Sequence, residues 1–163
     1  MAKENLPVTA AIRVLREHGV PYIARMYDYE PRGGTSKSAE SLGVDEHVVI
    51  KTLVMQDETK RPLVVLMHGD CEVSTKALAR HLGVKSIAPC KPDVADRHSG
   101  YQVGGTSPLG LRRAMPIYME RSIASLPRIL VNGGRRGLLV EIDPTDLVRV
   151  LGPQLVDAAA GGG

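Results

Sequence analysis

The alternation of hydrophobic and polar positions divides the chain into short helices and strands. Apolar residues recur at helical spacing between Asn5 and Gly19, which predicts an amphipathic helix. The two most apolar segments, 48–55 and 62–67, are separated by a polar stretch at 57–61. This pattern predicts an antiparallel hairpin of two strands.

Weaker patterns predict the remaining elements. Helices are expected where a capping residue precedes an apolar period and a glycine follows it: from Ser36 to Leu42, from Ser74 to Leu82, from Lys91 to His98, and from Asp143 to Gly152. Strands are expected at 21–30, 84–88, 117–119, 129–131 and 138–142, and loops or turns at 31–36, 104–110 and 132–137. No repeat or linker divides the chain. We therefore expect a single α/β (α+β) domain at 1–157, with a mixed, largely antiparallel sheet, and a flexible tail at 158–163.

Composition narrows the class of protein. The chain has 163 residues, of which 43% are hydrophobic and 24% charged, as in ordinary soluble globular domains. No apolar run approaches the roughly 20 residues of a bilayer span, and no signal peptide is recognisable at the N-terminus. We therefore expect a cytoplasmic protein without a membrane partner. Cys71 and Cys90 form no CxxC pair, so neither a zinc site nor a disulfide framework is expected.

The charge is unevenly distributed. The net charge is only +3, but the segment from Arg97 to Arg136 contains seven arginines and a single acidic residue, Glu120. The chain becomes acidic after Gly137. A polyanion would therefore meet the basic segment. A solvated basic surface without a partner is the alternative.

Lys51 is the sharpest local anomaly. It lies in segment 48–55, where both alternating faces are otherwise apolar, as in a central strand buried on both sides. A buried ammonium without an anion is costly. Lys51 is therefore either a functional lysine or a side chain that reaches solvent from an edge strand.

Two glycine-rich segments could approach a ligand closely. Consecutive glycines in 104–110 expose backbone N–H groups that suit a carbonyl or phosphate oxygen, although an ordinary loop is the alternative. Segment 132–137 is either a hairpin turn or a second wall of the same site. No nucleotide-binding motif or serine-hydrolase elbow is present. Because the chain has no Phe and no Trp, RNA contact is expected mainly through phosphates and sugars.

Three segments, 50–54, 100–110 and 131–137, resemble in order the motifs of the YbaK / prolyl-tRNA synthetase-associated editing-domain family. The resemblance implies a compact, β-barrel-like mixed sheet flanked by helices. It also implies a trans-acting hydrolase that frees wrongly attached amino acids from tRNA, typically tRNA(Pro). Neither a cofactor nor a metal is implied. The expected partners are the aminoacylated 3′ end of tRNA and, as a candidate, prolyl-tRNA synthetase.

The resemblance also assigns roles to residues. Lys51 matches the family's essential lysine and would bind the 3′-terminal nucleotide, while backbone N–H groups at Gly104 and Gly105 would stabilise the ester oxygen in the transition state. The catalytic base would come from the substrate, through a ribose hydroxyl or a cysteinyl thiol. The residues expected to bind substrate are Tyr27, Thr52, Thr106, Ser107, Pro108, Gly110, Asn132, Gly133 and Gly134. The residues expected to bind tRNA are Arg112, Arg113, Arg135 and Arg136.

The chain departs from many relatives with cysteinyl-tRNA activity at three places. Those relatives carry Ser at the position of Asn132, an acidic residue at that of Leu139, and an aromatic residue in the loop 32–35. Small side chains differ by only about 1–3 kcal/mol in such a pocket. We expect Cys-tRNA(Pro) as the first substrate and Ala-tRNA(Pro) as the next. A non-catalytic module of the same fold that binds tRNA or a synthetase is the alternative.

Overall fold

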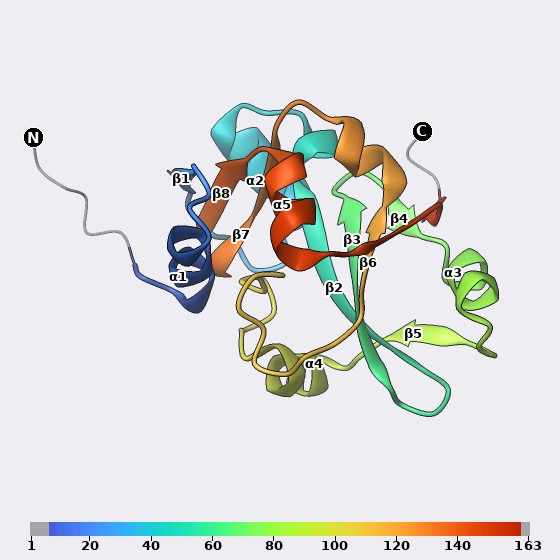
Figure 1. The fold of residues 1–163 in the computed structure, drawn as a ribbon. Helices are drawn as coiled ribbons and strands as arrows, with labels where there is room; N and C mark the ends of the chain where they lie inside the picture. The colour runs from blue at the N-terminus through green and yellow to red at the C-terminus, as the bar shows by residue number, and fades with distance from the viewer. Residues whose placement is uncertain (1–6, 161–163) are drawn as a thin grey trace, which may run out of the picture.

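The computed structural model describes residues 7–160, which form two main sheets with helices around them (Figure 1). A five-stranded sheet has the order β5-β2-β3-β6-β9, a three-stranded sheet the order β1-β8-β7, and β10 pairs with β4 alone. The strands are β1 (Ile23–Met26), β2 (Ile50–Asp57), β3 (Pro62–His68), β4 (Glu72–Val73), β5 (Ile87–Pro89), β6 (Ile117–Glu120), β7 (Ile129–Arg135), β8 (Leu138–Ile142), β9 (Gln154–Val156) and β10 (Ala159–Ala160). The helices are α1 (Ala10–Glu17), α2 (Gly34–Leu42), α3 (Thr75–Leu82), α4 (Pro92–Ser99) and α5 (Pro144–Leu151), with short 3-10 helices η1 (Glu46–Val48) and η2 (Arg121–Ser125).

The predicted hairpin is confirmed as β2 and β3. The two strands pair antiparallel, and Lys51 lies opposite Met67. Every residue of β3 is buried, which explains its continuous apolar sequence. Because β6 pairs parallel to β3, and β9 parallel to β6, the sheet is mixed as expected.

The sheets do not form the closed barrel that the resemblance suggests. Within residues 7–160, the only pairing between the two main sheets is an isolated bridge between Val49 and Leu130. Strand β7 then continues through a register shift between Asn132 and Arg135, where the sequence predicts only a turn. The fold class is α+β. After the bridge at Val49, one edge of β2 has no strand partner until it meets β5.

Most helix limits follow the predicted caps. Ser74 accepts a hydrogen bond from the Ala77 N–H at the start of α3, and Asp143 caps α5 in the same way. The prediction of Ser36 as a cap is wrong, because α2 already begins at Gly34. The neighbouring Thr35 hydroxyl instead donates to Glu46 and to the Gly69 carbonyl. It thereby ties the start of α2 to η1 and to the end of β3.

The C-terminal segment is more ordered than its composition suggests. Ala158 is buried, and its carbonyl accepts a hydrogen bond from the Ser74 N–H at 2.7 Å. Ala159–Ala160 then pairs with β4. The expectation of a flexible tail is therefore wrong for 158–160, since pairing and burial hold the backbone. Residues 161–163, like the predicted start of the first helix at Asn5, lie outside the described range.

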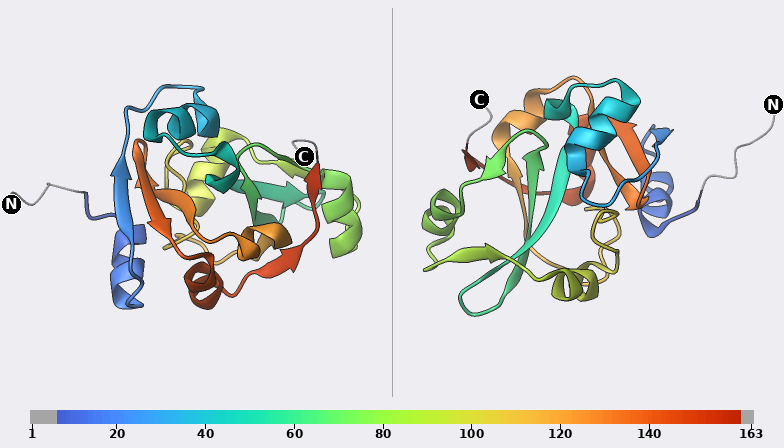
Figure 2. Two further views of the ribbon diagram at one scale, coloured as in Figure 1. Left: turned by 90° about the horizontal axis from the view of Figure 1, so that it is seen from above. Right: turned by 180° about the vertical axis from the view of Figure 1, so that it is seen from behind.

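Two hydrophobic cores lie on opposite faces of the five-stranded sheet. The larger core joins this sheet to the three-stranded sheet, α1 and α5, and takes Ile50 and Val54 from β2. The smaller core lies under α3 and takes Met55 from β2, with Leu53 packed against it. Figure 2 shows α1 and α3 at opposite ends of the molecule with the sheets between them. No helix within residues 7–160 combines the length and apolar character that crossing a bilayer requires.

Candidate functional site: a cavity at the open edge of β2

A cavity of about 780 Å³ lies against the open edge of β2. One edge of β2 pairs with β3 throughout. The other edge pairs with β5 only from Met55 onward and meets β7 only through the bridge at Val49. Between these two points, residues 51–53 have no strand partner on that side within the described chain. The cavity therefore lies where the two sheets separate.

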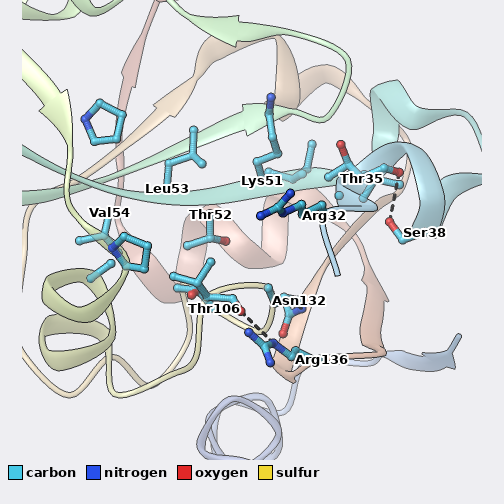
Figure 3. A pocket seen from close by; sticks show the side chains of 18 of the residues that line it. Arg32, Thr35, Ser38, Lys51, Thr52, Leu53, Val54, Thr106, Asn132 and Arg136 are labelled. Carbon is cyan, nitrogen blue, oxygen red and sulfur yellow. Dashed lines mark hydrogen bonds between the residues drawn. The ribbon is translucent and has the colours of Figure 1, made fainter. Parts of the chain in front are cut away.

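The two faces of β2 present different chemistry to this cavity (Figure 3). Lys51 and Leu53 project to one side of the strand, whereas Thr52 and Val54 project to the other, toward Thr106. Lys51 is half-buried and forms no ion pair with any residue of 7–160. Its ammonium group is thus free to meet an anion, but it does not point at the glycine-rich loop. A ligand that contacts both must cross the edge of β2.

Thr52 lines the cavity, and its hydroxyl oxygen is buried in the cavity wall without a hydrogen-bond partner. Its Oγ1 is the one side-chain nitrogen or oxygen atom in the described chain that is fully buried and has no hydrogen-bond partner. An unpaired buried polar group costs about 1–3 kcal/mol. Such a group in a cavity wall indicates a place where a ligand supplies the missing hydrogen bond.

Gly104 and Gly105 differ in what their backbones can offer. Gly104 lines the cavity with a φ of +92°, and a Cβ there would lie 2.6 Å from the Tyr29 Oη, so no side chain fits. The Gly105 N–H donates to the Gln102 carbonyl at 2.7 Å and is therefore already used within the loop. The amides of Gly104 and Thr106 have no partner among residues 7–160, and both residues line the cavity.

Three residues at the C-terminal end of this loop, which are predicted to bind substrate, do not line the cavity. Ser107 is fully buried, and its hydroxyl accepts a hydrogen bond from the Leu109 N–H at 3.2 Å. Pro108 is buried beside it, and Gly110 packs so closely on Ala10 that an added Cβ would lie 3.1 Å away. None of the three lines the cavity. They shape the loop and fix it to α1.

Tyr101 holds the same loop from beneath. Its hydroxyl donates to the Leu109 carbonyl at 2.6 Å. Burial raises the pKa of Tyr101 to about 12, so the phenol stays protonated through the physiological range. The loop that contains Gly104 and Thr106 therefore rests on a hydrogen-bonded support.

Asn132 joins the two glycine-rich segments that the sequence singled out. Its Nδ2 donates to the Gly104 carbonyl at 3.2 Å, and its Oδ1 accepts from the N–H groups of Gly134 and Arg135. Asn132 lines the cavity, but Gly133 and Gly134 do not. The side chain of Asn132 is thus used mainly to position the loop.

The four arginines predicted to bind tRNA separate into two groups. Arg136 lines the cavity, donates through Nε to the Val103 carbonyl at 2.9 Å and lies over the Tyr29 ring at 5.0 Å. Arg135 is exposed next to it. Arg112 and Arg113 are exposed after the glycine-rich loop and do not line the cavity.

Sequence reasoning identified Tyr27 in the cavity wall but missed other lining residues. Arg32 lies at the mouth with a φ of +65°, a conformation that non-glycine residues rarely adopt. Lys37 and Cys90 also line the cavity. The only sequence feature that could have indicated these residues was the loop before Gly33, and the composition of that loop does not point to any particular ligand. Within 7–160, the one group of side chains close enough to hold a metal is outside the cavity, at His47, Asp70 and Cys71.

Comparison with known proteins identifies the family. The family described as "Aminoacyl-tRNA editing domain" matches residues 30–150. "Putative Cys-tRNA(Pro)/Cys-tRNA(Cys) deacylase EbsC" of Enterococcus faecalis is 28% identical over 158 residues, covering 95% of each chain. A "Proline--tRNA ligase" of Citrifermentans bemidjiense is 30% identical over 88 residues, which cover 54% of this chain and 15% of the ligase.

Solved structures share the fold. "Crystal structure of hypothetical protein APE2540" superposes with a TM-score of 0.84 at 22% identity, over 93% of this chain and 99% of the other. "Crystal structure of a putative trans-editing enzyme for prolyl tRNA synthetase" gives a TM-score of 0.78 at 21% identity, over 96% of this chain and 100% of the other. The match to the family over residues 30–150 covers most of the chain. The chain therefore belongs to the aminoacyl-tRNA editing-domain family, the YbaK-like group whose motifs its sequence resembles.

Proposed function

We propose that the protein is a trans-acting aminoacyl-tRNA deacylase that hydrolyses mischarged tRNA(Pro), with Cys-tRNA(Pro) as its first substrate and Ala-tRNA(Pro) as the next. The observation that carries this proposal is the unsatisfied hydroxyl of Thr52, buried in a cavity with Lys51 on the other side of the same strand. The Thr52 hydroxyl has no hydrogen-bond partner and the Lys51 ammonium has no ion-pair partner in the described chain. An aminoacylated nucleotide could supply both. The similarity to the Enterococcus faecalis relative, named as a Cys-tRNA(Pro)/Cys-tRNA(Cys) deacylase, supports the choice of substrate class.

In the proposed complex, the acylated 3′ end crosses the open edge of β2. Lys51 would hold a phosphate or ribose oxygen on one face. The ester would lie on the other face, where Thr52 and the amides of Gly104 and Thr106 can donate hydrogen bonds to its carbonyl oxygen. That oxygen gains negative charge as the tetrahedral intermediate forms, and fixed donors stabilise it without reorganisation. The neighbouring ribose hydroxyl or, for a cysteinyl ester, the thiol would assist the attack on the ester.

The part of the cavity beside Thr52 suits a small side chain. Val54, Cys90 and Ala95 line it and belong to the larger hydrophobic core. Leu139, at a position where many cysteinyl-specific relatives have an acidic residue, also lines the cavity and packs in a separate cluster with Val49 and Leu130. An apolar wall accepts a methyl or a thiomethyl group readily but offers little to a hydroxymethyl group. This favours cysteine and alanine over serine.

The reaction is proposed to need neither a metal nor a cofactor. Within residues 7–160, the one group of three side chains close enough to share a metal is His47, Asp70 and Cys71, and none of these lines the cavity. Stabilisation of the charge on the ester oxygen would come instead from Thr52 and backbone amides. Activity that survives dialysis against a chelator would support this view, and activity restored only by a divalent cation would contradict it.

The exposed arginines would bind the RNA backbone. Arg136 stands at the cavity wall and Arg135 next to it, so both lie where phosphates near the 3′ end would pass. Replacing both with Glu should weaken tRNA binding and flatten its dependence on salt, because fewer counterions are released. Arg112→Glu with Arg113→Glu tests the second pair separately. If the salt dependence of tRNA binding is unchanged in either double variant, that pair of arginines does not contact the RNA backbone.

A deacylation panel tests the proposed function directly. The purified protein is mixed with Cys-, Ala-, Ser- and Thr-tRNA(Pro), and release of the amino acid is followed with and without prolyl-tRNA synthetase. We expect the fastest turnover with Cys-tRNA(Pro), followed by Ala-tRNA(Pro). Tight binding of every charged tRNA without turnover would instead favour a non-catalytic binding module. Turnover limited to Ser- or Thr-tRNA(Pro) would contradict the proposed pocket.

A further inference from the structure

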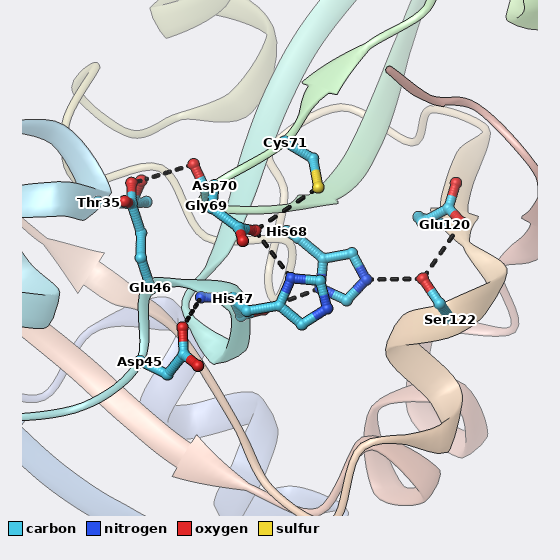
Figure 4. A network of polar contacts seen from close by, with 10 residues as sticks. All are labelled: Thr35, Asp45, Glu46, His47, His68, Gly69, Asp70, Cys71, Glu120 and Ser122. Atoms are coloured by element: carbon cyan, nitrogen blue, oxygen red, sulfur yellow. Dashed lines mark hydrogen bonds and ion pairs between the residues drawn. The ribbon is translucent and has the colours of Figure 1, made fainter. Parts of the chain in front are cut away.

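A second group of reactive side chains lies at the turn that follows β3, outside the cavity (Figure 4). His47 from η1 meets Asp70 and Cys71 from the turn, and one ligating atom of each lies within 4.8 Å of the others. The His47 Nδ1 is 2.8 Å from the Asp70 Oδ1, and the Cys71 Sγ is 3.5 Å from the same oxygen. An imidazole, a carboxylate and a thiol from two separate segments thus converge on one point.

This arrangement does not fit nucleophilic catalysis. In a cysteine nucleophile pair the imidazole contacts the sulfur directly, whereas here the carboxylate of Asp70 lies between His47 and Cys71. The cluster is therefore better suited to binding a ligand than to attacking an ester or a peptide.

We propose that His47, Asp70 and Cys71 bind a single zinc ion. Imidazole, carboxylate and thiolate are all zinc ligands, and a mixed set of nitrogen, oxygen and sulfur favours zinc over calcium or magnesium. Tetrahedral zinc separates its ligand atoms by about 3.3–3.7 Å, as follows from bonds of about 2.0–2.3 Å. The oxygen–sulfur distance of 3.5 Å already fits, and the nitrogen–oxygen distance of 2.8 Å needs only a small opening.

The imidazole is held in position by its surroundings. The His47 ring stacks on the His68 ring at 3.7 Å with 7° between their planes. The His68 Nδ1 donates to the His47 carbonyl at 2.8 Å, which fixes the backbone of η1. His68 is itself buried and bonded through Nε2 to Ser122. A fixed ring loses little freedom when it binds a metal, so this support strengthens the proposed site.

The site is also open to solvent on one side. The side chains of His47 and Asp70 keep 35% and 31% of their surface exposed, while Cys71 closes the inner side. Three protein ligands with one exposed direction leave the fourth position of the zinc ion to water. None of the three residues lines the cavity at β2, and the proposed ion would brace η1 against the turn after β3.

Zinc binding by the whole chain, reduced and without an affinity tag, tests the proposal. Zn²⁺ is titrated against a chelating dye, and Co²⁺ serves as a probe whose near-ultraviolet charge-transfer band reports a bound thiolate. We expect one Zn²⁺ per chain and a thiolate band with Co²⁺. His47→Gln, Asp70→Asn and Cys71→Ser should each weaken binding by about tenfold or more. His47→Gln and Asp70→Asn change half-exposed side chains, so loss of folding does not obscure their result.

Matched controls are available in the same chain. Cys90→Ser removes the other cysteine and His18→Gln an exposed histidine remote in sequence from the cluster, and both should bind Zn²⁺ as the unmodified chain does. Absence of a stoichiometric site, full affinity in any of the three ligand variants, or an equal loss in Cys90→Ser would overturn the proposal. The deacylation panel does not depend on this result, since zinc binding is measured without tRNA.

Discussion

The cavity at β2 and the buried network at the end of β3 are both polar, yet they differ in how completely their hydrogen bonds are satisfied. In the network, His68 donates to the His47 carbonyl, the Ser122 hydroxyl lies within hydrogen-bond distance of both His68 and Glu120, and Glu120 accepts the Ala158 N–H. In the cavity, the Thr52 hydroxyl has no partner and Lys51 no ion pair within the described chain. A saturated network stabilises the fold, whereas unsatisfied groups cost stability that a ligand can recover. Substitutions should therefore affect stability in one region and activity in the other.

Lys51→Ala should produce the largest effect on activity. Removal of the ammonium deletes a charge that the proposed substrate needs, and kcat/KM for Cys-tRNA(Pro) should fall by about 10²–10³-fold. The free energy of unfolding should stay nearly unchanged, because Lys51 forms no ion pair that would be lost. The two quantities are measured by single-turnover deacylation and by urea denaturation.

Two further variants serve as controls for Lys51→Ala. Lys51→Met keeps most of the length of the side chain but not its charge, and it should be as inactive as the alanine variant. Lys76→Ala removes an exposed lysine of α3 and should be fully active. Full activity of Lys51→Ala would contradict the assignment of the cavity as the active site, since the unpaired cation would then have no role.

Glu120→Ala should produce the largest effect on stability. The substitution leaves the Ala158 N–H and the Ser122 hydroxyl without the carboxylate that they contact at 2.8 Å and 3.2 Å. The buried Ala158 N–H loses its partner, whereas the exposed Ser122 hydroxyl can bond to water, so the free energy of unfolding should fall by about 1–3 kcal/mol. Glu120→Gln keeps an acceptor and should lose less. A folded variant with strongly reduced deacylation would show that the network is not merely structural.

Thr52→Val tests the unsatisfied hydroxyl of the cavity with a smaller expected effect on activity. The substitution keeps the shape of the side chain and deletes the unsatisfied hydroxyl, so the protein should be as stable as before or more stable. Loss of one hydrogen bond to the ester should lower kcat/KM by about tenfold. Thr52→Ser keeps the hydroxyl and should restore most of the activity. A Thr52→Val protein that is both less stable and fully active would contradict the assignment.

The contrast between these regions also explains what the sequence could predict. Local rules located the β2–β3 hairpin and the caps at Ser74 and Asp143, because period, capping and turn chemistry act over a few neighbouring residues. The resemblance led to Lys51 and Thr52, and both line the cavity. What could not be predicted was the direction of each side chain.

The missing information depends on contacts between distant segments. Ser107 looks like a ligand-binding hydroxyl in the sequence, but its bond to the Leu109 N–H turns it into the interior. The Gly105 amide is lost to Gln102 in the same way. Ala158 looks frayed by composition, yet it is held by Ser74 and Glu120. In each case a partner that no local pattern specifies decides the role.

Tyr101→Phe should have the smallest effect and separates the support of the loop from its chemistry. The phenol donates to the Leu109 carbonyl at 2.6 Å, and loss of this bond should cost about 1 kcal/mol of unfolding free energy. Because burial raises the folded-state pKa of Tyr101 from 10.0 to about 12, its stabilisation is complete below pH 10 and is lost as the pH rises toward 12. The stability difference between Tyr101→Phe and the unmodified chain should therefore shrink over this alkaline range in urea titrations. Deacylation at neutral pH should fall by less than about threefold, since the amides of Gly104 and Thr106 remain in place. If it fell as far as in Thr52→Val, the hydroxyl of Tyr101 would have to be counted with the unsatisfied groups of the cavity rather than with its satisfied support.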